Sequence, residues 1–135
     1  MHLQGEKNYY LSVIYGIGID IVKIDRIKAV VEKWGHRFLK RVFTDHEIIY
    51  CYGKRIPYLS LAVRFAAKEA LIKAIGSEVP VTLTDIEVAN IETGKPVFKF
   101  SEKLEIFFRT KNIKAAHLSL SHEHEYGVAC VVLEQ

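Results

Sequence analysis

The feature that most constrains the fold is an apolar run over residues 11–22, interrupted by a single carboxylate, Asp20. Its β-branched residues favour a strand, and Gly16 and Gly18 within it indicate the close approach of another backbone or a ligand. With Asp20 inside it, the run falls short of the roughly 18 uncharged residues that a membrane span requires. We therefore expect a buried strand here and no membrane span.

Asp20 has two interpretations from this segment alone, and the segment favours neither. A carboxylate buried among apolar residues needs a cation, a hydrogen-bond network or a metal ion. Alternatively, Asp20 lies at the end of the strand and caps the next turn. The neighbouring glycines do not form a dinucleotide fingerprint, because GxGxxG would need a glycine where Ile21 stands, and no GxxxxGK[ST] loop occurs.

The rest of the chain alternates short helical and extended patterns without a linker or a repeat. With 135 residues, half of them hydrophobic, it is long enough for one compact core and too short for two. We expect helices over residues 25–40, from 44 or 45 onward, 58–75 and 101–110, and strands over residues 13–21, 82–91, 96–100, 115–120 and 126–133. This order predicts an α+β fold, a mostly antiparallel sheet with inserted helices.

Basic residues concentrate in the first predicted helix. At about 100° per residue, four of them fall within about 60° of one another beside the apolar stripe: Arg26, Lys33, Arg37 and Lys40. The net charge of +3 is too small to indicate a dedicated nucleic-acid protein. The stripe is either a solvated face or a surface that attracts an acidic protein or a phosphate-rich ligand.

The helix predicted over residues 58–75 carries a second group of charges. Glu69 and Lys73 lie one turn apart, which is typical of an exposed ion pair, while Arg64 and Lys68 share a neighbouring face. Phe65 places an apolar side chain on the stripe of Glu69. A carboxylate beside a buried stripe, with a lysine one turn on, also suits a metal and phosphate site.

Histidines and cysteines offer weaker signals. His122 and His124 point the same way if their strand persists, with His117 nearby, so they are either a transition-metal pair or polar residues at a hairpin tip. Cys51 and Cys130 have no partner spacing, and we interpret both as reduced thiols. No secretory signal is visible, so we expect a cytoplasmic protein.

Several segments together carry a family resemblance. They are IYGIGIDIV over residues 14–22, IDRI over 24–27, RFAAKEA over 64–70 followed by Lys73, GKP over 94–96 and SLSH over 119–122. In this order and at these spacings, the chain resembles the holo-[acyl-carrier-protein] synthases, the small bacterial type of 4′-phosphopantetheinyl transferase. Members of that family move the phosphopantetheine arm of coenzyme A onto a serine of apo acyl carrier protein, release adenosine 3′,5′-bisphosphate, use Mg²⁺ and support fatty acid biosynthesis.

The resemblance implies a role for each candidate residue. Asp20 and Glu69 are the expected Mg²⁺ ligands and, with Lys73, the catalytic residues; Glu69 accepts the serine proton either directly or through a metal-bound water. The residues expected to bind coenzyme A are Arg64, Lys73 and His122. Those expected to bind the acidic carrier are Arg26, Lys33, Arg37 and Lys40.

The resemblance also implies an assembly and a domain boundary. Small bacterial members are homotrimers with active sites at subunit interfaces, and we expect no nucleic-acid or membrane partner. Residues 14–135 are expected to form a single domain with a phosphopantetheinyl transferase-like fold, preceded by an N-terminal extension over residues 1–13. The loop over residues 77–80 lacks the glycines frequent in the family, which puts its backbone contacts with coenzyme in question.

Two other functions compete with this one. A non-enzymatic binding module would use the basic helix but would leave Asp20 and Glu69 unexplained. A metal-dependent phosphohydrolase would use His117, His122 and His124, although such enzymes need more ligands at recognisable spacing. Weighing an apo carrier protein after incubation with coenzyme A and Mg²⁺ separates the three.

Overall fold

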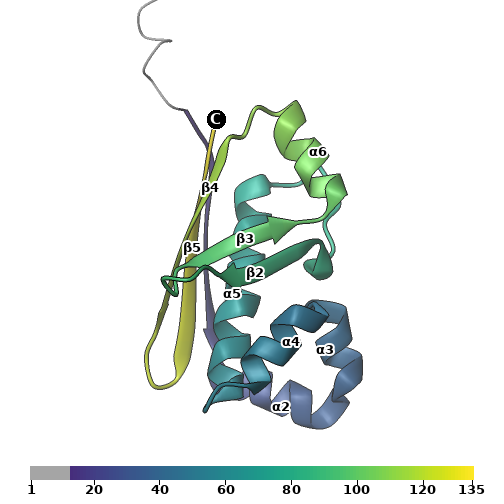
Figure 1. Ribbon diagram of the computed structural model, residues 1–135, viewed down its shortest axis with the longest axis vertical. Coiled ribbons are helices and arrows are strands. Elements are labelled where there is room, and N and C mark those ends of the chain that lie inside the picture. The colour runs from purple at the N-terminus through teal and green to yellow at the C-terminus, as the bar shows by residue number, and fades with distance from the viewer. Residues whose placement is uncertain (1–12) are drawn as a thin grey trace, which may run out of the picture.

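The computed structural model describes residues 13–135, in which helices are inserted between strands (Figure 1). In chain order the elements are β1 (Ile14–Lys23), α2 (Ile24–Trp34), α3 (His36–Val42), α4 (Asp45–Tyr52), α5 (Pro57–Ile75), a 3-10 turn η1 (Leu83–Asp85), β2 (Ile86–Asn90), β3 (Pro96–Phe100), α6 (Glu102–Thr110), β4 (Ala115–His122) and β5 (Tyr126–Glu134). The predicted N-terminal extension lies outside the described residues except for Val13, whose carbonyl accepts a hydrogen bond from the Gln135 amide at 2.8 Å.

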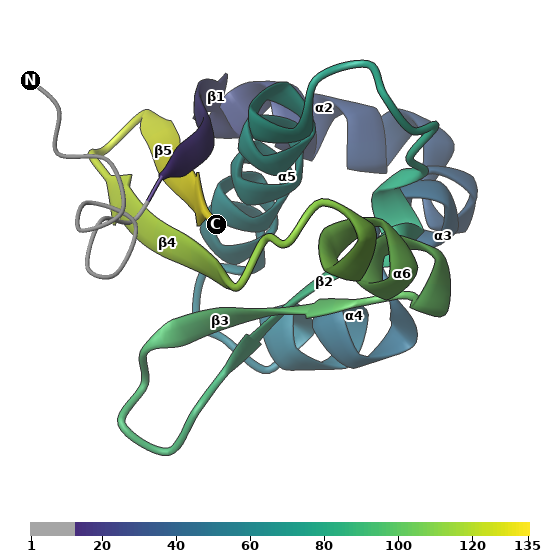
Figure 2. The same ribbon diagram turned by 90° about the horizontal axis from the view of Figure 1, so that it is seen from above.

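The strands form two antiparallel sheets, which confirms the predicted α+β class. One sheet has the order β1-β5-β4 and the other is the β2–β3 hairpin. Seen from above, α5 runs between the three-stranded sheet and the remaining elements, with α2 and α3 to one side and the hairpin and α6 to another (Figure 2). The core therefore surrounds α5.

Two glycines of β1 bring its backbone against α5. A Cβ atom on Gly16 would lie 1.9 Å from the Ala74 carbonyl oxygen, and one on Gly18 would lie 1.7 Å from the Ala70 carbonyl oxygen. Both alanines belong to the small-residue face of α5, so helix and strand approach to backbone contact. This confirms the close approach that the glycines predict.

The strand β1 is buried on one face only, so the predicted burial holds for that face and not for the other. Ile17, Ile19 and Ile21 are each more than 60% exposed. Successive side chains of a strand point to opposite faces, and α5 covers only the face that carries the glycines and Asp20. The opposite face of the sheet is uncovered within the described residues.

The single helix predicted over residues 25–40 is wrong as well. Gly35 stands at φ +55° and divides it into α2 and α3. A left-handed residue cannot continue a right-handed helix, so the chain turns and begins a new axis. The first helix starts at Ile24 after Lys23, one residue earlier than predicted, and Asp25 lies in its first turn.

Other helix ends follow their predicted signals. Thr44 and Glu47 form a reciprocal capping box at the start of α4, and Ser101 accepts a hydrogen bond from the Leu104 amide at the start of α6. Gly76 ends α5 at φ +82°. The strand predicted over residues 82–91 begins later, because η1 takes up its first residues. No helix within residues 13–135 is both long enough and apolar enough to cross a membrane.

Candidate active site

The two carboxylates singled out in the sequence line one pocket. It has a volume of about 300 Å³ and lies where β1, α5 and the α2–α3 pair meet. Asp20 comes from β1, Glu69 and Phe65 come from α5, and Arg26 and Phe38 come from the two short helices. Residues far apart in the sequence therefore form one half-apolar cleft with two acids and a guanidinium on its walls.

Strand alternation places Asp20 in this pocket. Gly16, Gly18 and Asp20 share the face of β1 that meets α5, and the two glycines allow α5 to approach closely enough for Glu69 to line the same cleft. The strand continues to Lys23, so Asp20 is not a turn cap at its end. This decides between the two interpretations that the sequence leaves open.

Lys73 is the cation that accompanies Asp20. Its Nζ lies 3.0 Å from Asp20 Oδ1 and 3.0 Å from the Ile19 carbonyl oxygen, to both of which it donates. The ion pair within α5 that the spacing of Glu69 and Lys73 suggests is not formed. Asp20 is therefore charge-compensated, while no cation within residues 13–135 is hydrogen-bonded to Glu69.

Glu69 consequently holds its proton more tightly than an ordinary glutamate. Burial in the half-apolar pocket raises the pKa of its carboxyl, and the negative charge of Asp20 raises it further. Lys73 acts in the opposite direction with a smaller effect. A carboxylate whose pKa is raised toward neutrality is suited to accept a proton in a reaction.

The two carboxylates suit a hard divalent cation that takes its other ligands from phosphate oxygens and water. Mg²⁺ is commonly held by one or two carboxylates, with phosphate oxygens and water completing its octahedron. Asp20 and Glu69 supply two such carboxylates on one pocket. Within residues 13–135 no cluster of three or more His, Cys, Asp or Glu side chains forms a metal cage.

His117 lies apart from His122 and His124, so these three histidines do not form one cluster. His117 Nε2 lies 2.9 Å from Glu134 Oε1 on the outer side of the sheet. His122 and His124 line a pocket at the β4–β5 hairpin beside Ile56 and Leu59. The phosphohydrolase alternative therefore lacks the shared histidine cluster on which it depends.

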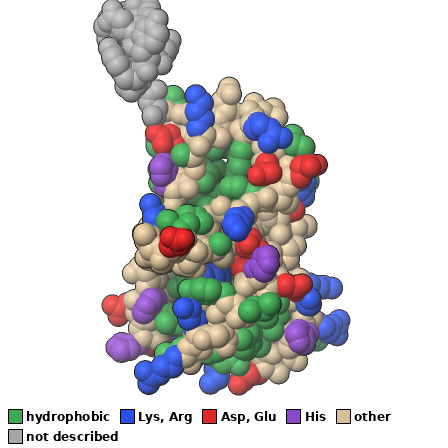
Figure 3. All heavy atoms as spheres, in the orientation of Figure 1, with side chains coloured by type: hydrophobic (Ala, Val, Ile, Leu, Met, Phe, Trp, Pro, Cys, Tyr) green, Lys and Arg blue, Asp and Glu red, His purple; other side chains and the backbone are tan. Residues whose placement is uncertain are grey.

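His122 instead borders basic residues that the sequence analysis missed. One adjoining pocket brings it beside Lys54 and Arg55, which precede α5, and another beside Lys95 of the β2–β3 turn. The pair Lys54 and Arg55, just before the helix-starting Pro57, is a sequence signal that was available. These pockets lie over the N-terminal part of α5, and Lys, Arg and His side chains gather in the lower half of the molecule (Figure 3).

Arg64 lies beneath the pocket that contains Lys95 and is only 3% exposed. Its Nη1 donates to Ser60 Oγ at 3.0 Å and its Nη2 to Asn90 Oδ1 at 2.6 Å, while its Cζ stands 4.3 Å from the Tyr50 ring centroid. Its Nε is buried without a hydrogen-bond partner. Contact with a coenzyme phosphate remains a prediction, and Asn90 and Tyr50 both line the pocket above it.

The basic residues expected to share one helix face belong to two helices. Arg26 and Lys33 are on α2, whereas Arg37 and Lys40 are on α3, so the angular argument for one stripe does not hold. All four are exposed. Lys40 is paired with Asp45 at 2.7 Å.

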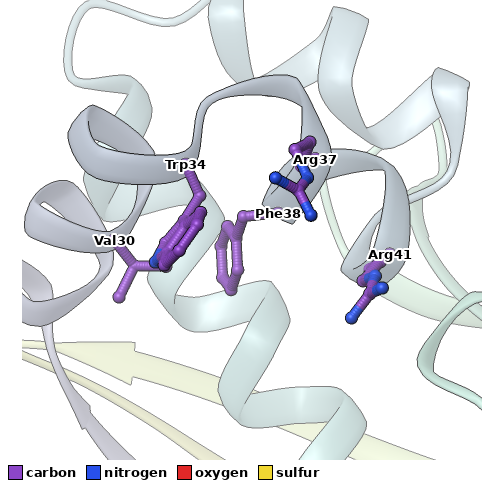
Figure 4. A pocket seen from close by; sticks show the side chains of 5 residues that line it. All are labelled: Val30, Trp34, Arg37, Phe38 and Arg41. Carbon is purple, nitrogen blue, oxygen red and sulfur yellow. The ribbon is translucent and has the colours of Figure 1, made fainter.

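The break at Gly35 creates an apolar groove between these charges. Val30 and Trp34 of α2 face Phe38 of α3, and Arg37 and Arg41 stand on the α3 side (Figure 4). Trp34 is half exposed, and Arg37 lies against its ring, with Cζ 5.7 Å from the centroid. The sequence analysis missed Trp34 and Arg41 as surface groups because it treated this stretch as one amphipathic helix.

Comparison with known proteins gives a consistent picture. A family model described as the 4′-phosphopantetheinyl transferase superfamily matches residues 16–131. The holo-[acyl-carrier-protein] synthase of Halothermothrix orenii is 44% identical over 124 residues, covering 91% of this chain and 99% of that relative. The crystal structure of the synthase from Neisseria meningitidis superposes with a TM-score of 0.85 at 35% identity, covering 91% and 100% of the two chains. That from Bacillus anthracis in complex with CoA (3′,5′-ADP) does so with a TM-score of 0.74 at 38% identity, covering 90% and 97%.

Proposed function

Because the chain belongs to the holo-[acyl-carrier-protein] synthases of the 4′-phosphopantetheinyl transferase superfamily, we propose that it transfers phosphopantetheine from coenzyme A to a serine of apo acyl carrier protein and releases adenosine 3′,5′-bisphosphate. The observation that carries the proposal is the meeting of Asp20 and Glu69 in one pocket. The Bacillus anthracis relative binds coenzyme A, which supports the donor substrate.

Asp20 and Glu69 are the residues that would hold Mg²⁺. When bound, the ion neutralises charge on the pyrophosphate oxygens of coenzyme A. Lys73 donates to Asp20 and thereby orients that carboxylate. The Lys73 side chain is also 55% exposed, so its ammonium can donate to a phosphate oxygen beside the same site.

In the transfer, the carrier serine oxygen forms a bond to the β-phosphorus of coenzyme A, and the bond from that phosphorus to the bridging oxygen breaks. The electron pair leaves with adenosine 3′,5′-bisphosphate, and the serine proton passes to Glu69. The raised pKa of Glu69 suits it to this role as base. Arg64 and His122 would hold the coenzyme phosphates, and Lys54 lines the same pocket as His122.

An acidic carrier protein is the partner proposed for the basic surface. Arg26 stands on the wall of the reaction pocket, and Lys33 and Arg37 flank the exposed Trp34 ring. Positive charges around an apolar groove attract an acidic partner and then bury one of its apolar side chains. Lys40 belongs to the same surface, although its pair with Asp45 weakens its part.

A homotrimer with active sites at the subunit interfaces is the proposed assembly. The exposed isoleucines Ile17, Ile19 and Ile21 pair across β1 and β5 with Val132, Cys130 and Val128. This makes a continuous apolar face, and exposed patches of this kind mark association surfaces. The pocket of His122 borders the edge strand β4, where a neighbouring subunit would complete it. We assign the reaction to fatty acid biosynthesis in the cytoplasm, where these substrates meet.

The test is to incubate the protein with coenzyme A, Mg²⁺ and an apo carrier and to weigh the carrier. The carrier should gain the mass of phosphopantetheine, and Asp20→Asn and Glu69→Gln should each abolish the gain while remaining folded by circular dichroism. Glu105→Gln, an exposed carboxylate on α6, is the matched control and should keep full activity. An unmodified carrier with the wild-type protein would refute the proposal.

A further inference from the structure

A fully buried ion pair lies outside the proposed mechanism. Lys68 of α5 is 0% exposed and Glu47 of α4 is 1% exposed, and Lys68 Nζ lies 2.6 Å from Glu47 Oε1. In the alanine-rich sequence of α5 this lysine suggests a surface charge. The fold instead encloses it beside the Phe43 ring, whose centroid is 5.3 Å from Nζ.

The side-chain nitrogen of Lys68 and the carboxylate oxygens of Glu47 also form hydrogen bonds with other elements. Lys68 Nζ also donates to the Val42 carbonyl oxygen at 2.7 Å and to the Leu83 carbonyl oxygen at 3.1 Å. The Glu47 carboxylate accepts from the Thr44 amide at 2.9 Å and from the Val88 amide at 2.7 Å. The pair therefore joins the end of α3, the start of α4, η1 and β2 to α5, and all three donors of Lys68 are used.

Stability alone is a weak reason for such a pair. Removing two charges from water is expensive, and well-packed apolar residues of similar volume are often as stable or more stable. A fully satisfied network has a different effect, because its directional hydrogen bonds permit only one relative placement of the elements that it joins. The pair is therefore best explained by the placement that it enforces.

The elements that this pair holds together carry the proposed docking surface on α3 and the proposed base, Glu69, on α5. Lys68 immediately precedes Glu69, and about 100° of helical rotation turns the first toward α3 and α4 and the second toward the reaction pocket. The Val42 carbonyl that Lys68 holds is the last of α3, the helix that carries Arg37 and Phe38. Phe38 lines both the groove of Trp34 and the pocket of Glu69.

We propose that Lys68, held by Glu47, is a positioning residue for the transfer reaction: it fixes α3, on which the carrier docks, at one distance from Glu69. The inference rests on the proposed function and deepens it. A misplacement of about 1 Å between a bound substrate and a catalytic group lowers rates about 100-fold. Loss of the Lys68–Glu47 ion pair is therefore expected to slow transfer without preventing docking of the carrier.

The test compares Lys68→Met with Leu104→Ala, a buried substitution in α6 that lowers stability away from this network. Both are assayed at a temperature where each is fully folded. We expect Lys68→Met to lower kcat at least tenfold, with the KM for coenzyme A and the Kd for a tryptophan-free carrier changed less than threefold. The Kd is read from the fluorescence of Trp34, which is the one tryptophan of the chain. Leu104→Ala should keep kcat within twofold of wild type.

Hydrogen exchange gives a readout that does not depend on transfer. The Phe43 amide donates to the Leu39 carbonyl at the end of α3, and its exchange should accelerate in Lys68→Met but not in Leu104→Ala. If Lys68→Met fails to fold, Glu47→Gln decides, since it keeps the size but removes the charge and one of the two acceptor oxygens that bind Lys68, Thr44 and Val88; an unchanged kcat would overturn the inference. So would equal kcat values in Lys68→Met and Leu104→Ala. An inactive wild-type protein would overturn the proposed function itself, which separates the two failures.

Discussion

Gly18→Ala is the perturbation whose effect the structure specifies most directly. The added Cβ would stand 1.7 Å from the Ala70 carbonyl oxygen and 2.7 Å from its carbon, whereas ordinary contact begins near 3.4 Å. The strand and α5 must therefore separate by about 1.7 Å, because both obstacles are backbone atoms and no side chain can rotate away. Overpacking against such rigid groups should lower the free energy of unfolding by about 3 kcal/mol, the upper end of the usual range. For a chain of this length that lowers Tm by about 10 °C.

The same displacement reaches the reaction pocket. Gly18 is on the face of β1 that carries Asp20, and Ala70 follows Glu69 on α5, so a separation at this point moves the two carboxylates apart. A shift of about 1 Å in such a site lowers the rate about 100-fold. Calorimetry and the carrier mass assay, run well below the reduced Tm, measure the two effects separately.

Gly53→Ala is the matched control for stability. Gly53 has φ −80°, which any residue adopts, and an added Cβ would meet nothing closer than the Tyr50 carbonyl oxygen at 3.4 Å. Its Tm should remain within about 2 °C of wild type. A Gly18→Ala protein that also melted within 2 °C of wild type and kept its transfer rate would refute the argument that backbone contact between β1 and α5 builds the site.

Three further predictions concern the pocket, the docking surface and the sheet. Folding raises the pKa of Glu69, so the folded protein binds that proton more tightly than the unfolded chain does. Ionisation of Glu69 therefore lowers the stability of the fold as the pH rises above the ordinary value of 4.5. Calorimetry at pH 7 should show a higher Tm for the inactive Glu69→Gln. Arg37→Glu should raise the KM for the carrier at least tenfold in steady-state assays with that for coenzyme A unchanged; equal effects on both would argue against docking at α3. Ile19→Asp should give monomers by sedimentation and remove activity, whereas a monomeric wild-type protein at micromolar concentration would contradict the trimer.

Much of the fold follows from local signals in the chain. Ser101 and Gly76 mark helix ends by side-chain and backbone chemistry that acts over three or four residues, and a helix does start at Asp45 as expected, where the structure adds a capping box of Thr44 with Glu47. The break at Gly35 was missed because an isolated glycine within a helical pattern is compatible with a continuous helix. Only the packing of both segments against their neighbours requires the left-handed turn there.

The candidate site was less accessible to local reasoning. Family resemblance brought Asp20 and Glu69 together before the structure did, while the residues around Asp20 alone allowed two interpretations. The partner of Lys73 could not be chosen from spacing, because a lysine one turn from Glu69 reaches either that residue or another element. Lys68 was interpreted as one of several helix charges, and its burial depends on three other elements that close around it, α3, α4 and η1.

By itself, therefore, the sequence determined the α+β class, the helix ends that have local caps, the glycines that demand a close neighbour and the acidic and basic residue types of the candidate site. The tertiary structure decided which face of β1 is buried, where the first helical stretch breaks and which acid each lysine pairs with. The physical reason is range: caps and turns are set by atoms a few residues apart. Burial, ion pairing and the distance between Asp20 and Glu69 instead depend on elements that meet only after the chain has folded around α5.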